Sequence, residues 1–449
     1  MTPPRTSGCS PNLAHVDRVA FLRDVDALRA RLLAGLGADD LRHLAAHVRA
    51  SRACTLGGYG FALAAGWILE RQAATGPQTA WMSLAAARLV VLAAALLGLG
   101  TYSAWITMHH VGHRGYDRVP GVPPRWTSRR FARGARRYLD WLDWMTPEAW
   151  IHEHNMLHHG RTGEEADPDL VERNALILRT WRAPRVFKLL AVGFAAVSWK
   201  FLYYAPNTIR ALHRAERARA GHRDPESDED AARRLFDLGR PESRAELRRL
   251  LSPRSAEGRT LWLRCWLPYV AIRFGLLPAP ALLVGPRAWA AVVVASVLGE
   301  LLTNLQGFLT ITPNHTGDDL PRFEGHAHDR AEFTLRQIVG SVDYTGGMAW
   351  SDFLQGYLNY QIEHHVWADL PMLKYRQAQP ELEALCARHG VPYVREPLGR
   401  RFGKLVAILV GDATTPVLDT APPSQDAAPR PTPPGPGERA CHLAPEATA

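Results

Sequence analysis

Long apolar blocks separated by arginine-rich stretches dominate the pattern of this chain. The blocks cover residues 53–70, 84–106, 261–284 and 288–312. Each approaches the roughly 20 apolar residues needed to cross a hydrocarbon core about 30 Å thick. The pattern therefore predicts four transmembrane helices. A fifth apolar stretch, residues 186–206, contains Lys188 and Lys200, and we interpret it as an interfacial helix.

The distribution of positive charge predicts which side of the membrane the loops occupy. Residues 107–260 contain 28 Lys and Arg residues, whereas the short connectors on the other side contain Arg71 and Arg287. Short loops rich in Lys and Arg stay in the cytoplasm, so the large loop is predicted to be cytoplasmic. The expected fold class is an all-α, multi-pass integral membrane protein of a bacterial inner membrane, with a helical cap on the cytoplasmic face.

The segments outside the predicted spans are polar. Residues 1–15 are expected to be disordered, and residues 16–50 have helical apolar spacing typical of two short amphipathic helices outside the bilayer. Residues 207–258 form a charged insert, soluble and helical or flexible. The Pro-rich residues 412–449 predict a disordered tail. This division leaves residues 51–411 as the membrane domain.

Composition excludes several other classes of protein. The chain has 449 residues and a net charge of +9. Its mean hydropathy is −0.18, an average that does not reveal the apolar blocks. We expect no nucleic acid partner, because no nucleic-acid motif is present and cytoplasmic loops explain the excess Arg. The 5 cysteines include no CxxC pair, which argues against a disulfide framework or a thiolate metal site. The N-terminus has no apolar core typical of a signal peptide.

Histidines gather next to the predicted spans. His109 and His113 are spaced i and i+4, which places two helical side chains on one face, and His154 and His158 repeat that step. The clustered positions are His109, His110 and His113; His152, His154, His158 and His159; His315; and Gln361, His364 and His365. The predicted topology brings all of them to the cytoplasmic side. We therefore expect the imidazoles to meet at a single site.

This many histidines predicts more than one metal ion. Neutral imidazole suits iron, zinc and copper, and eight or more ligands exceed the four of one tetrahedral zinc. His110 and His152 could either support the ligands or face solvent, and His326 and His328 are expected not to be ligands. The remaining histidines have no partner pattern and are expected at the surface: His15, His43, His47, His213, His222, His389 and His442.

Three of these clusters resemble the histidine boxes of the membrane fatty acid desaturase family. They read His109-His110-Val111-Gly112-His113, His154-Asn155-Met156-Leu157-His158-His159 and Gln361-Ile362-Glu363-His364-His365. The third box, followed by Pro371-Met372-Leu373-Lys374-Tyr375, is similar to that of the front-end desaturases, and Glu164-Glu165-Ala166-Asp167-Pro168-Asp169 is similar to the family as well. The resemblance covers roughly residues 55–400.

The resemblance implies a di-iron centre that uses O₂ to insert a double bond into a fatty acyl chain. It also implies the metal ligands, which are His109, His113, His154, His158, His159, His315, His364 and His365, with Gln361 in the place of the first histidine of box three. Whether Gln361 binds iron stays open at this point. The acyl group could be carried by a lipid, by coenzyme A or by an acyl carrier protein.

Two features depart from the family pattern. Front-end desaturases usually contain a fused cytochrome b5 domain with an HPGG motif, which this sequence lacks, so we expect a separate electron donor, either ferredoxin or a cytochrome b5-like protein. His110 also stands where Asp is usual in box one. Carboxylates could hold the free N–H groups of the imidazoles, and the candidates are Glu153, Asp167, Asp169, Asp343 and Glu363.

Two other functions compete with desaturation. A hydroxylase or ketolase acting on a lipid, alkane, sterol or carotenoid would use the same boxes. A metal transporter would need ionisable residues near the bilayer midplane. The predicted spans contain few, namely Arg88, Arg264, Arg273 and Glu300, and the histidines lie outside the spans.

Overall fold

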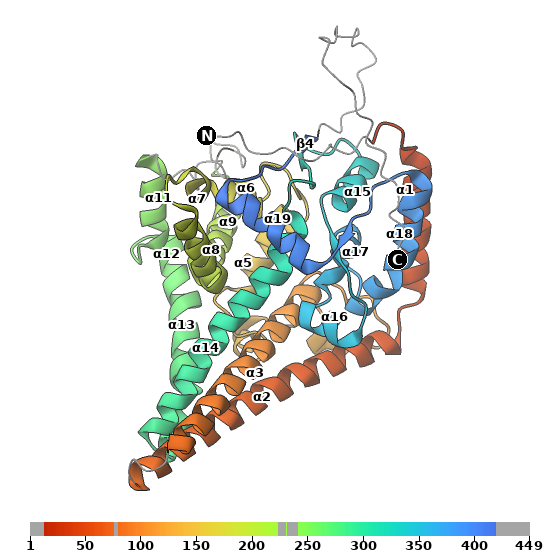
Figure 1. The fold of residues 1–449 in the computed structure, drawn as a ribbon. Coiled ribbons are helices and arrows are strands. Elements are labelled where there is room, and N and C mark those ends of the chain that lie inside the picture. Colours follow the sequence, from red (N-terminus) through yellow and green to blue (C-terminus); the bar gives the residue numbers. More distant parts are fainter. Residues whose placement is uncertain (1–12, 76–79, 223–229, 231–240, 419–449) are drawn as a thin grey trace.

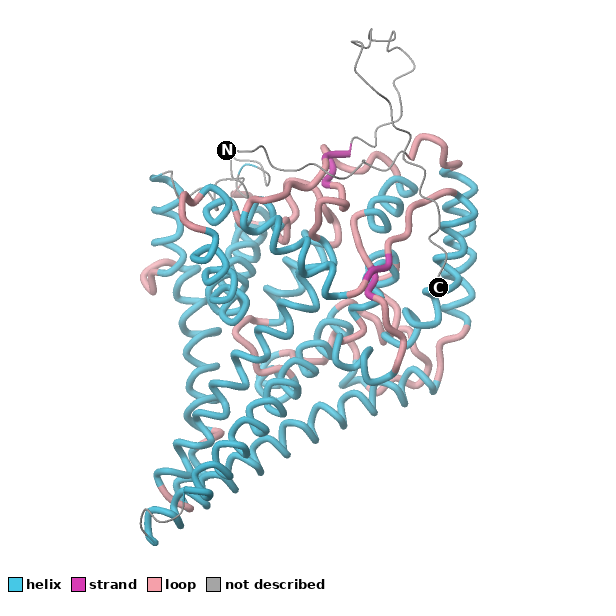
Figure 2. The backbone as a smooth tube through the Cα atoms, viewed as in Figure 1, coloured by secondary structure: helices cyan, strands magenta, loops and turns pink. Residues whose placement is uncertain are grey.

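Helices form almost all of the regular structure in the computed structural model, which describes residues 13–75, 80–222, 230 and 241–418. Helices α2, α3, α13 and α14 run together toward the narrow end of the molecule, at the lower left of Figure 1. The remaining elements lie at the wide end. Strands are short and occur only at the wide end, as Figure 2 shows for the described residues.

The helices keep the order of the sequence. In the first half they are α1 (Arg18–Ala34), α2 (Ala38–Thr75), α3 (Ala80–Gly112), α4 (Arg137–Asp140), α5 (Pro147–Ile151), α6 (Val171–Asn174), α7 (Leu176–Thr180), α8 (Arg185–Trp199) and α9 (Ala205–Arg219). In the second half they are α11 (Pro241–Leu251), α12 (Ala256–Thr260), α13 (Leu267–Val270), α14 (Pro286–Ile311), α15 (Arg330–Val339), α16 (Ala349–Gln355), α17 (Gln361–Val366), α18 (Met372–His389) and α19 (Leu398–Val410).

Tighter and wider helical turns connect these elements. The 3₁₀ turns are η1 (Pro124–Trp126), η2 (Gly134–Arg136), η7 (Ala279–Leu283), η8 (Thr312–His315) and η9 (Leu358–Tyr360). The π-helical segments are η3 (His152–His158), η4 (Lys200–Tyr204), η5 (Leu261–Trp266) and η6 (Ala271–Leu276).

Two small parallel sheets fasten the C-terminal region. Strand β1 (Arg322–Phe323) pairs with β4 (Val417–Leu418), and β2 (Asp343–Tyr344) pairs with β3 (Arg395–Glu396). The first sheet includes part of the segment expected to be a disordered tail, so residues 412–418 are structured. The rest of that expected tail, like most of residues 1–15 and part of the charged insert, lies outside the described residues.

The N-terminal region differs from the two short amphipathic helices that were expected. Helix α1 is amphipathic, begins after the Asp17 cap and packs on α15 and α18. The second expected helix instead continues without interruption into the first apolar block, so Ala38–Thr75 is one helix. The expected span 53–70 is therefore the second half of α2.

Four helical runs are long and apolar enough to cross a membrane: Trp81–Gly112, Arg185–Arg219, Ala256–Leu283 and Pro286–His315. Three of them match the predicted spans 84–106, 261–284 and 288–312. The remaining run, Arg185–Arg219, contains the stretch 186–206 that was expected to be interfacial. Helix α2 is not among these runs, but it packs along α3 and α14. Which of these two helices crosses the bilayer stays a prediction.

Small residues let the long helices approach one another closely. A Cβ atom added at Gly66 of α2 would lie 2.2 Å from the Cα of Ala288 in α14. One added at Gly98 of α3 would lie 3.0 Å from the carbonyl oxygen of Gly299. Interfaces between membrane helices are enriched in small residues for this reason. The glycines of α2 thus allow it to join the bundle.

We expect Gly66→Val to separate α2 from α14, because the new side chain would overlap the backbone at Ala288. Overpacking of this kind typically costs about 1–3 kcal/mol. Thermal unfolding of the purified protein in detergent should show a lower Tm. Gly60→Val in the same helix is the matched control, since a Cβ atom at Gly60 meets no other atom within 4 Å. Equal Tm values for the two variants would contradict the close packing described here.

Candidate metal centre

The end of α3 supplies the histidines of the first box. His109 and His113 have ring centroids 5.0 Å apart and are both buried. His110 points elsewhere, because its Nε2 atom lies 3.2 Å from the carbonyl oxygen of Gly356. Its ring also packs against Tyr375. Of the two roles left open for His110, the structure therefore favours support of the cluster over exposure to solvent.

The second box lies on a π-helical turn, which the sequence did not indicate. The backbone N–H of His159 donates to the carbonyl of His154 at 3.0 Å, a bond that spans five residues. A π-turn is wider than an α-turn, and such turns often occur at functional sites. The rings of His154 and His158 stack with centroids 5.1 Å apart, and the ring of His159 lies 4.9 Å from that of His154. The wide turn thus lets all three imidazoles enter one space.

The third box forms the short helix α17, which buried polar groups hold in place. Asp343 accepts a hydrogen bond of 2.9 Å from the backbone N–H of Ile362. The hydroxyl of Tyr393 lies 2.6 Å from Asp343 and 2.7 Å from Glu363. Burial, followed by the charge of Asp343, raises the pKa of the Glu363 carboxyl well above its usual range. A protonated carboxyl can lie beside a second one without repulsion.

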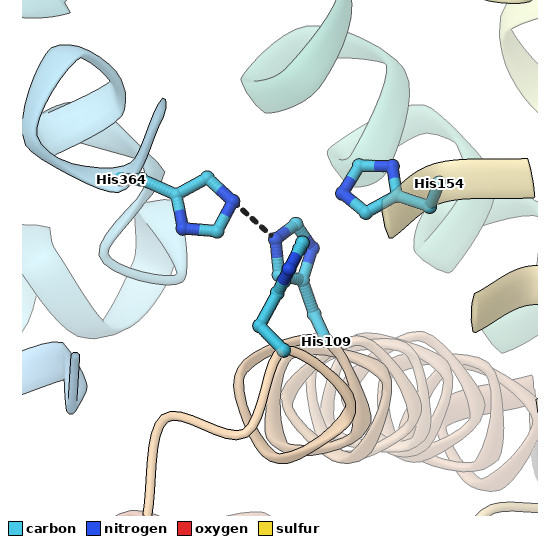
Figure 3. A group of neighbouring side chains, drawn as sticks. His109, His154 and His364 are labelled. Carbon is cyan, nitrogen blue, oxygen red and sulfur yellow. Dashed lines mark hydrogen bonds between the residues drawn. The ribbon is translucent and has the colours of Figure 1, made fainter. Parts of the chain in front are cut away.

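Imidazoles from all three boxes converge on one buried space. Figure 3 shows His109 of α3, His154 of η3 and His364 of α17 pointing toward one another. The Nε2 atoms of His109 and His364 are only 2.8 Å apart. One set of possible ligands is His109, His113, His154 and His364, whose nitrogen atoms lie within 4.8 Å of one another.

A second set lies beside the first and shares no residue with it. It contains His158, His315 and His365, and its nitrogen atoms also lie within 4.8 Å of one another. His159 connects the sets, because its ring centroid is 4.4 Å from that of His113 and 4.2 Å from that of His365. The structure therefore gathers every histidine proposed as a ligand into two adjacent sets, with His159 between them.

Gln361 joins the second set through His315. Its amide nitrogen lies 2.9 Å from Nε2 of His315, whose Nδ1 lies 3.1 Å from the carbonyl oxygen of Gly340. Nδ1 therefore carries the proton, and Nε2 accepts from the amide. The Oε1 atom of Gln361 is buried and has no hydrogen-bond partner among the described residues. Whether Gln361 is a ligand stays a prediction.

The nitrogen atoms of the cluster have the properties of metal ligands. Nε2 of His113, His154, His159 and His365 is buried and has no hydrogen-bond partner among the described residues. A buried polar atom without a partner is costly, and a metal ion would satisfy several of these lone pairs at once. The donor set of imidazoles, with one amide nearby, fits iron, although imidazole also suits zinc and copper.

The electrostatic environment keeps most of these imidazoles neutral, the form that binds metals. Burial, and then the neighbouring histidines, lowers the pKa of His154 and of His159 well below the usual range. His158 is different: burial acts to lower its pKa, but the charge and hydrogen bond of Asp167 outweigh burial and raise it. Burial thus favours the neutral form of His154 and His159, whereas Asp167 favours the protonated form of His158.

Hydrogen bonds fix the orientation of several rings. Nδ1 of His158 donates to Asp167 at 2.9 Å, and Nδ1 of His365 donates to Oε1 of Gln337 at 2.8 Å. Nδ1 of His364 lies 3.2 Å from the hydroxyl of Tyr375. Such partners set the tautomer, so that Nε2 faces the centre.

Sequence reasoning found only part of this supporting shell. Of the five candidate carboxylates, all within the described residues, only Asp167 forms a hydrogen bond to an imidazole. Glu153 and Asp169 lie beside His154, and Asp343 and Glu363 hold α17 instead. Gln337 was not a candidate for this role, and Tyr375 was noted only as part of the segment after box three. Gln337, on α15, is not part of any sequence motif. It reaches His365 only because α15 packs beside α17.

The other histidines lie outside the cluster. His326 bonds to Glu164 and is exposed, as expected for a residue that is not a ligand. The prediction of a surface position was wrong for His47, whose Nε2 is buried 3.1 Å from the carbonyl oxygen of Ser103. His43, His213 and His389 are half-buried, and His43 bonds to Tyr357. His43 and His47 belong to the part of α2 that packs inside the molecule. His442 lies outside the described residues.

An apolar pocket of about 470 Å³ opens onto the histidines. Its inner wall includes His109, His154, His158 and His315. Its outer part is lined mainly by aromatic and aliphatic side chains of α7 and α8. A pocket of this size and polarity suits an apolar ligand whose reacting atoms reach the metal centre.

The fold and site together define a helical protein, with helices able to cross a membrane and a buried polyhistidine centre able to hold metal. Comparison with known proteins identifies the family. The model for the family described as fatty acid desaturase matches residues 86–397, so the chain belongs to the fatty acid desaturase family. The resemblance of the three boxes is thereby confirmed.

Similarity to individual curated proteins is restricted to segments. A fatty acid desaturase 2-like protein of Mus musculus is 37% identical over 88 residues, which are 20% of this chain and 18% of that protein. A Delta(8)-fatty-acid desaturase of Euglena gracilis is 37% identical over 78 residues, 17% of each chain. An NADPH-dependent stearoyl-CoA 9-desaturase of Mycobacterium tuberculosis (strain H37Rv) is 26% identical over 130 residues, 28% of this chain and 30% of that protein.

The chain thus matches less than a third of the length of these relatives. No solved structure matches the chain.

We expect His154→Ala to lose most of the bound metal, because His154 belongs to three of the possible ligand groups. Metal analysis of protein purified from iron-supplemented cells would measure the loss. His326→Ala is the control, since this exposed histidine lies outside the cluster. Unchanged iron content in His154→Ala would remove that residue from the proposed centre.

Asp167→Ala should weaken metal binding about 10- to 100-fold, the usual effect of losing a partner that orients a ligand. Competition with a chelator gives the affinity. Asp169→Asn separates charge from hydrogen bonding, because Asp169 lies 3.8 Å from the same nitrogen of His158 and forms no hydrogen bond to it. Equal losses in both variants would mean that charge alone, and not the orienting bond, matters.

Proposed function

We propose that this protein is a fatty acyl desaturase that inserts a C=C bond into an acyl chain with a histidine-held di-iron centre, O₂ and two electrons. The observation that supports the proposal most strongly is the junction of two features. The paired histidine sets lie at the inner end of an apolar pocket, so an alkyl chain in the pocket would reach the metals. Membership of the desaturase family supports the same reaction.

Two iron ions are proposed because the histidines form two sets without a common residue. His109, His113, His154 and His364 would hold one ion, and His158, His315 and His365 the other, with His159 between them and Gln361 beside His315. Bound iron would supply the activation of O₂ that removal of hydrogen from an unactivated methylene requires. The balanced reaction takes two hydrogens from the chain, adds two electrons and two protons to O₂, and releases two molecules of water.

The protein side chains orient the imidazole rings and shield the centre from water. Asp167, Gln337 and Tyr375 fix the imidazole rings by hydrogen bonds. Trp105 and Trp150 pack against His109 with centroids 5.4 Å away and help to exclude water from the centre. Exclusion of water matters because it prevents side reactions of a reactive centre, such as proton leakage.

The electrons are proposed to come from a donor protein, a ferredoxin or a cytochrome b5-like protein, that docks on the cytoplasmic face. The loop after His113 supports this placement. Arg114, Arg129 and Arg130 are exposed there, and none forms an ion pair within the described ranges. Exposed cations attract a donor with an acidic surface and speed its association.

Hydroxylation or ketone formation on the same scaffold is the alternative. The apolar lining suits both reactions, because an alkyl chain that is hydroxylated is as apolar as one that is desaturated. Membership of the desaturase family favours desaturation. Metal transport is less compatible with the contacts inside the bundle. Glu300 accepts a hydrogen bond of 2.7 Å from Trp144, and Arg273 donates at 3.1 Å to Tyr59, so both charged groups have structural partners.

We expect His364→Ala to abolish double-bond formation when the full chain is expressed in a host whose lipids are profiled by gas chromatography. His364 lies in the first ligand set, and its loss opens that set. His328→Ala, an exposed histidine, should retain activity. A hydroxylated product from the unchanged protein would instead support the alternative. Unsaturated product from His364→Ala would contradict its role.

A further inference from the structure

The outer end of the pocket is bounded by helices whose apolar side chains are exposed. Ile177 on α7, Trp181 directly after α7, and Phe194 on α8 line the pocket and are 48%, 47% and 63% exposed. In Figure 1, α7 and α8 lie at the wide end, to the right of α11 and α12. The pocket therefore opens sideways, between α7 and α8.

The outward face of α8 is itself apolar. Val186, Leu190 and Phe194 are spaced four residues apart on one face, and all three are more than half exposed. A row of large apolar side chains is not stable in water but is at home in a bilayer. The run Arg185–Arg219 is also apolar and long enough for a membrane. The opening thus faces acyl chains rather than the aqueous phase.

Cations stand at the rim of this opening. Arg182 and Arg185 follow Trp181 in the turn between α7 and α8, and both are exposed. Arg185 pairs with Asp412, whereas Arg182 forms no ion pair in the described part of the chain. Trp next to Arg is typical of the headgroup level of a membrane, where the indole is half-buried and the guanidinium meets phosphate.

The rim is fixed in position. Nζ of Lys188 donates to the carbonyl oxygens of Arg179 at 2.9 Å and of Val410 at 2.8 Å. These bonds tie the start of α8 to the ends of α7 and α19. Because the opening is held by backbone contacts, a chain can enter without the opening first having to form.

We propose that the substrate is the acyl chain of an anionic membrane phospholipid, which enters sideways between α7 and α8 while its phosphate stays at Arg182. This inference rests on the proposed desaturase function and names the carrier of the acyl group. The phosphate-bearing carriers in water, acyl-coenzyme A and acyl carrier protein, would have to deliver the chain through the bilayer face. A second copy of the chain covering α8 would close this route.

Photolabelling tests the route without depending on turnover. The full-length protein is placed in vesicles of phosphatidylglycerol that contain a trace of phosphatidylglycerol with a diazirine in the middle of one acyl chain. After illumination, mass spectrometry locates the label. Phe308 and Leu358 line the pocket but are buried, at 7% and 1% exposure, so bulk lipid cannot reach them. We expect label at these residues.

A blocking variant and its control make the test specific. Ala195 of α8 lines the pocket and is exposed, so Ala195→Trp should obstruct the opening and remove most label from Leu358. Gly193→Trp places the same side chain in open space on the same helix, away from the pocket, and should keep the label. Loss of label in both variants, or in neither, would overturn the sideways route.

Charge at the rim is tested separately. In vesicles of neutral phosphatidylcholine that contain the same trace of diazirine phosphatidylglycerol, Arg182→Gln should reduce the label at Leu358 about fivefold, the effect of one cation near an anionic headgroup. Arg388→Gln, an exposed arginine on α18, should have no effect. Unchanged label at Leu358 in Arg182→Gln would overturn the headgroup assignment.

Parallel arms separate this inference from the proposed function. Oleoyl-phosphatidylglycerol, oleoyl-coenzyme A and oleoyl-acyl carrier protein are each offered with a reducing system, and new double bonds are measured. Product from the phospholipid alone, or fastest from it, supports the inference. Product from only a soluble carrier overturns it but leaves desaturation standing. Hydroxylated product, or labelling of the pocket without desaturation of any carrier, counts against the proposed function and not against the route.

Discussion

The burial of neutral imidazoles beside one another is the constraint on which the rest of this structure depends. Each ring brings a nitrogen lone pair out of water, and for His113, His154 and His159 no described residue accepts or donates at Nε2. Such a group is stable only if something else binds those lone pairs. A bound metal ion would do this, and the surrounding elements are positioned so that the rings meet.

The helix bundle contributes by bringing distant chain segments to the same level. Helices α3 and α14 pack closely through Gly98 and Gly299, and their ends carry the first box and His315 to the same end of the bundle. Helix α17 has no such long support. Instead, Asp343 and the neighbouring Tyr393 hold its backbone and its Glu363, and these contacts replace what a longer helix would provide.

Polarity is divided sharply along the pocket. The inner end is a cluster of imidazoles with their hydrogen-bond partners, and the outer end is nearly all hydrocarbon. A substrate with polar groups along its length would lose hydration in the outer part and gain no partners there. An alkyl chain loses nothing, so the same division that protects the centre also selects the chemistry of the ligand.

The sequence by itself determined the family, the histidine clusters and most of the helical architecture. Apolar blocks and i, i+4 histidines are local patterns, because a helix repeats every few residues. Only the tertiary structure decided that α2 is one helix from Ala38, that the second box lies on a π-turn, and that Gln337 supports His365. These features depend on side chains that meet across the fold, and no local pattern in the chain encodes such a meeting.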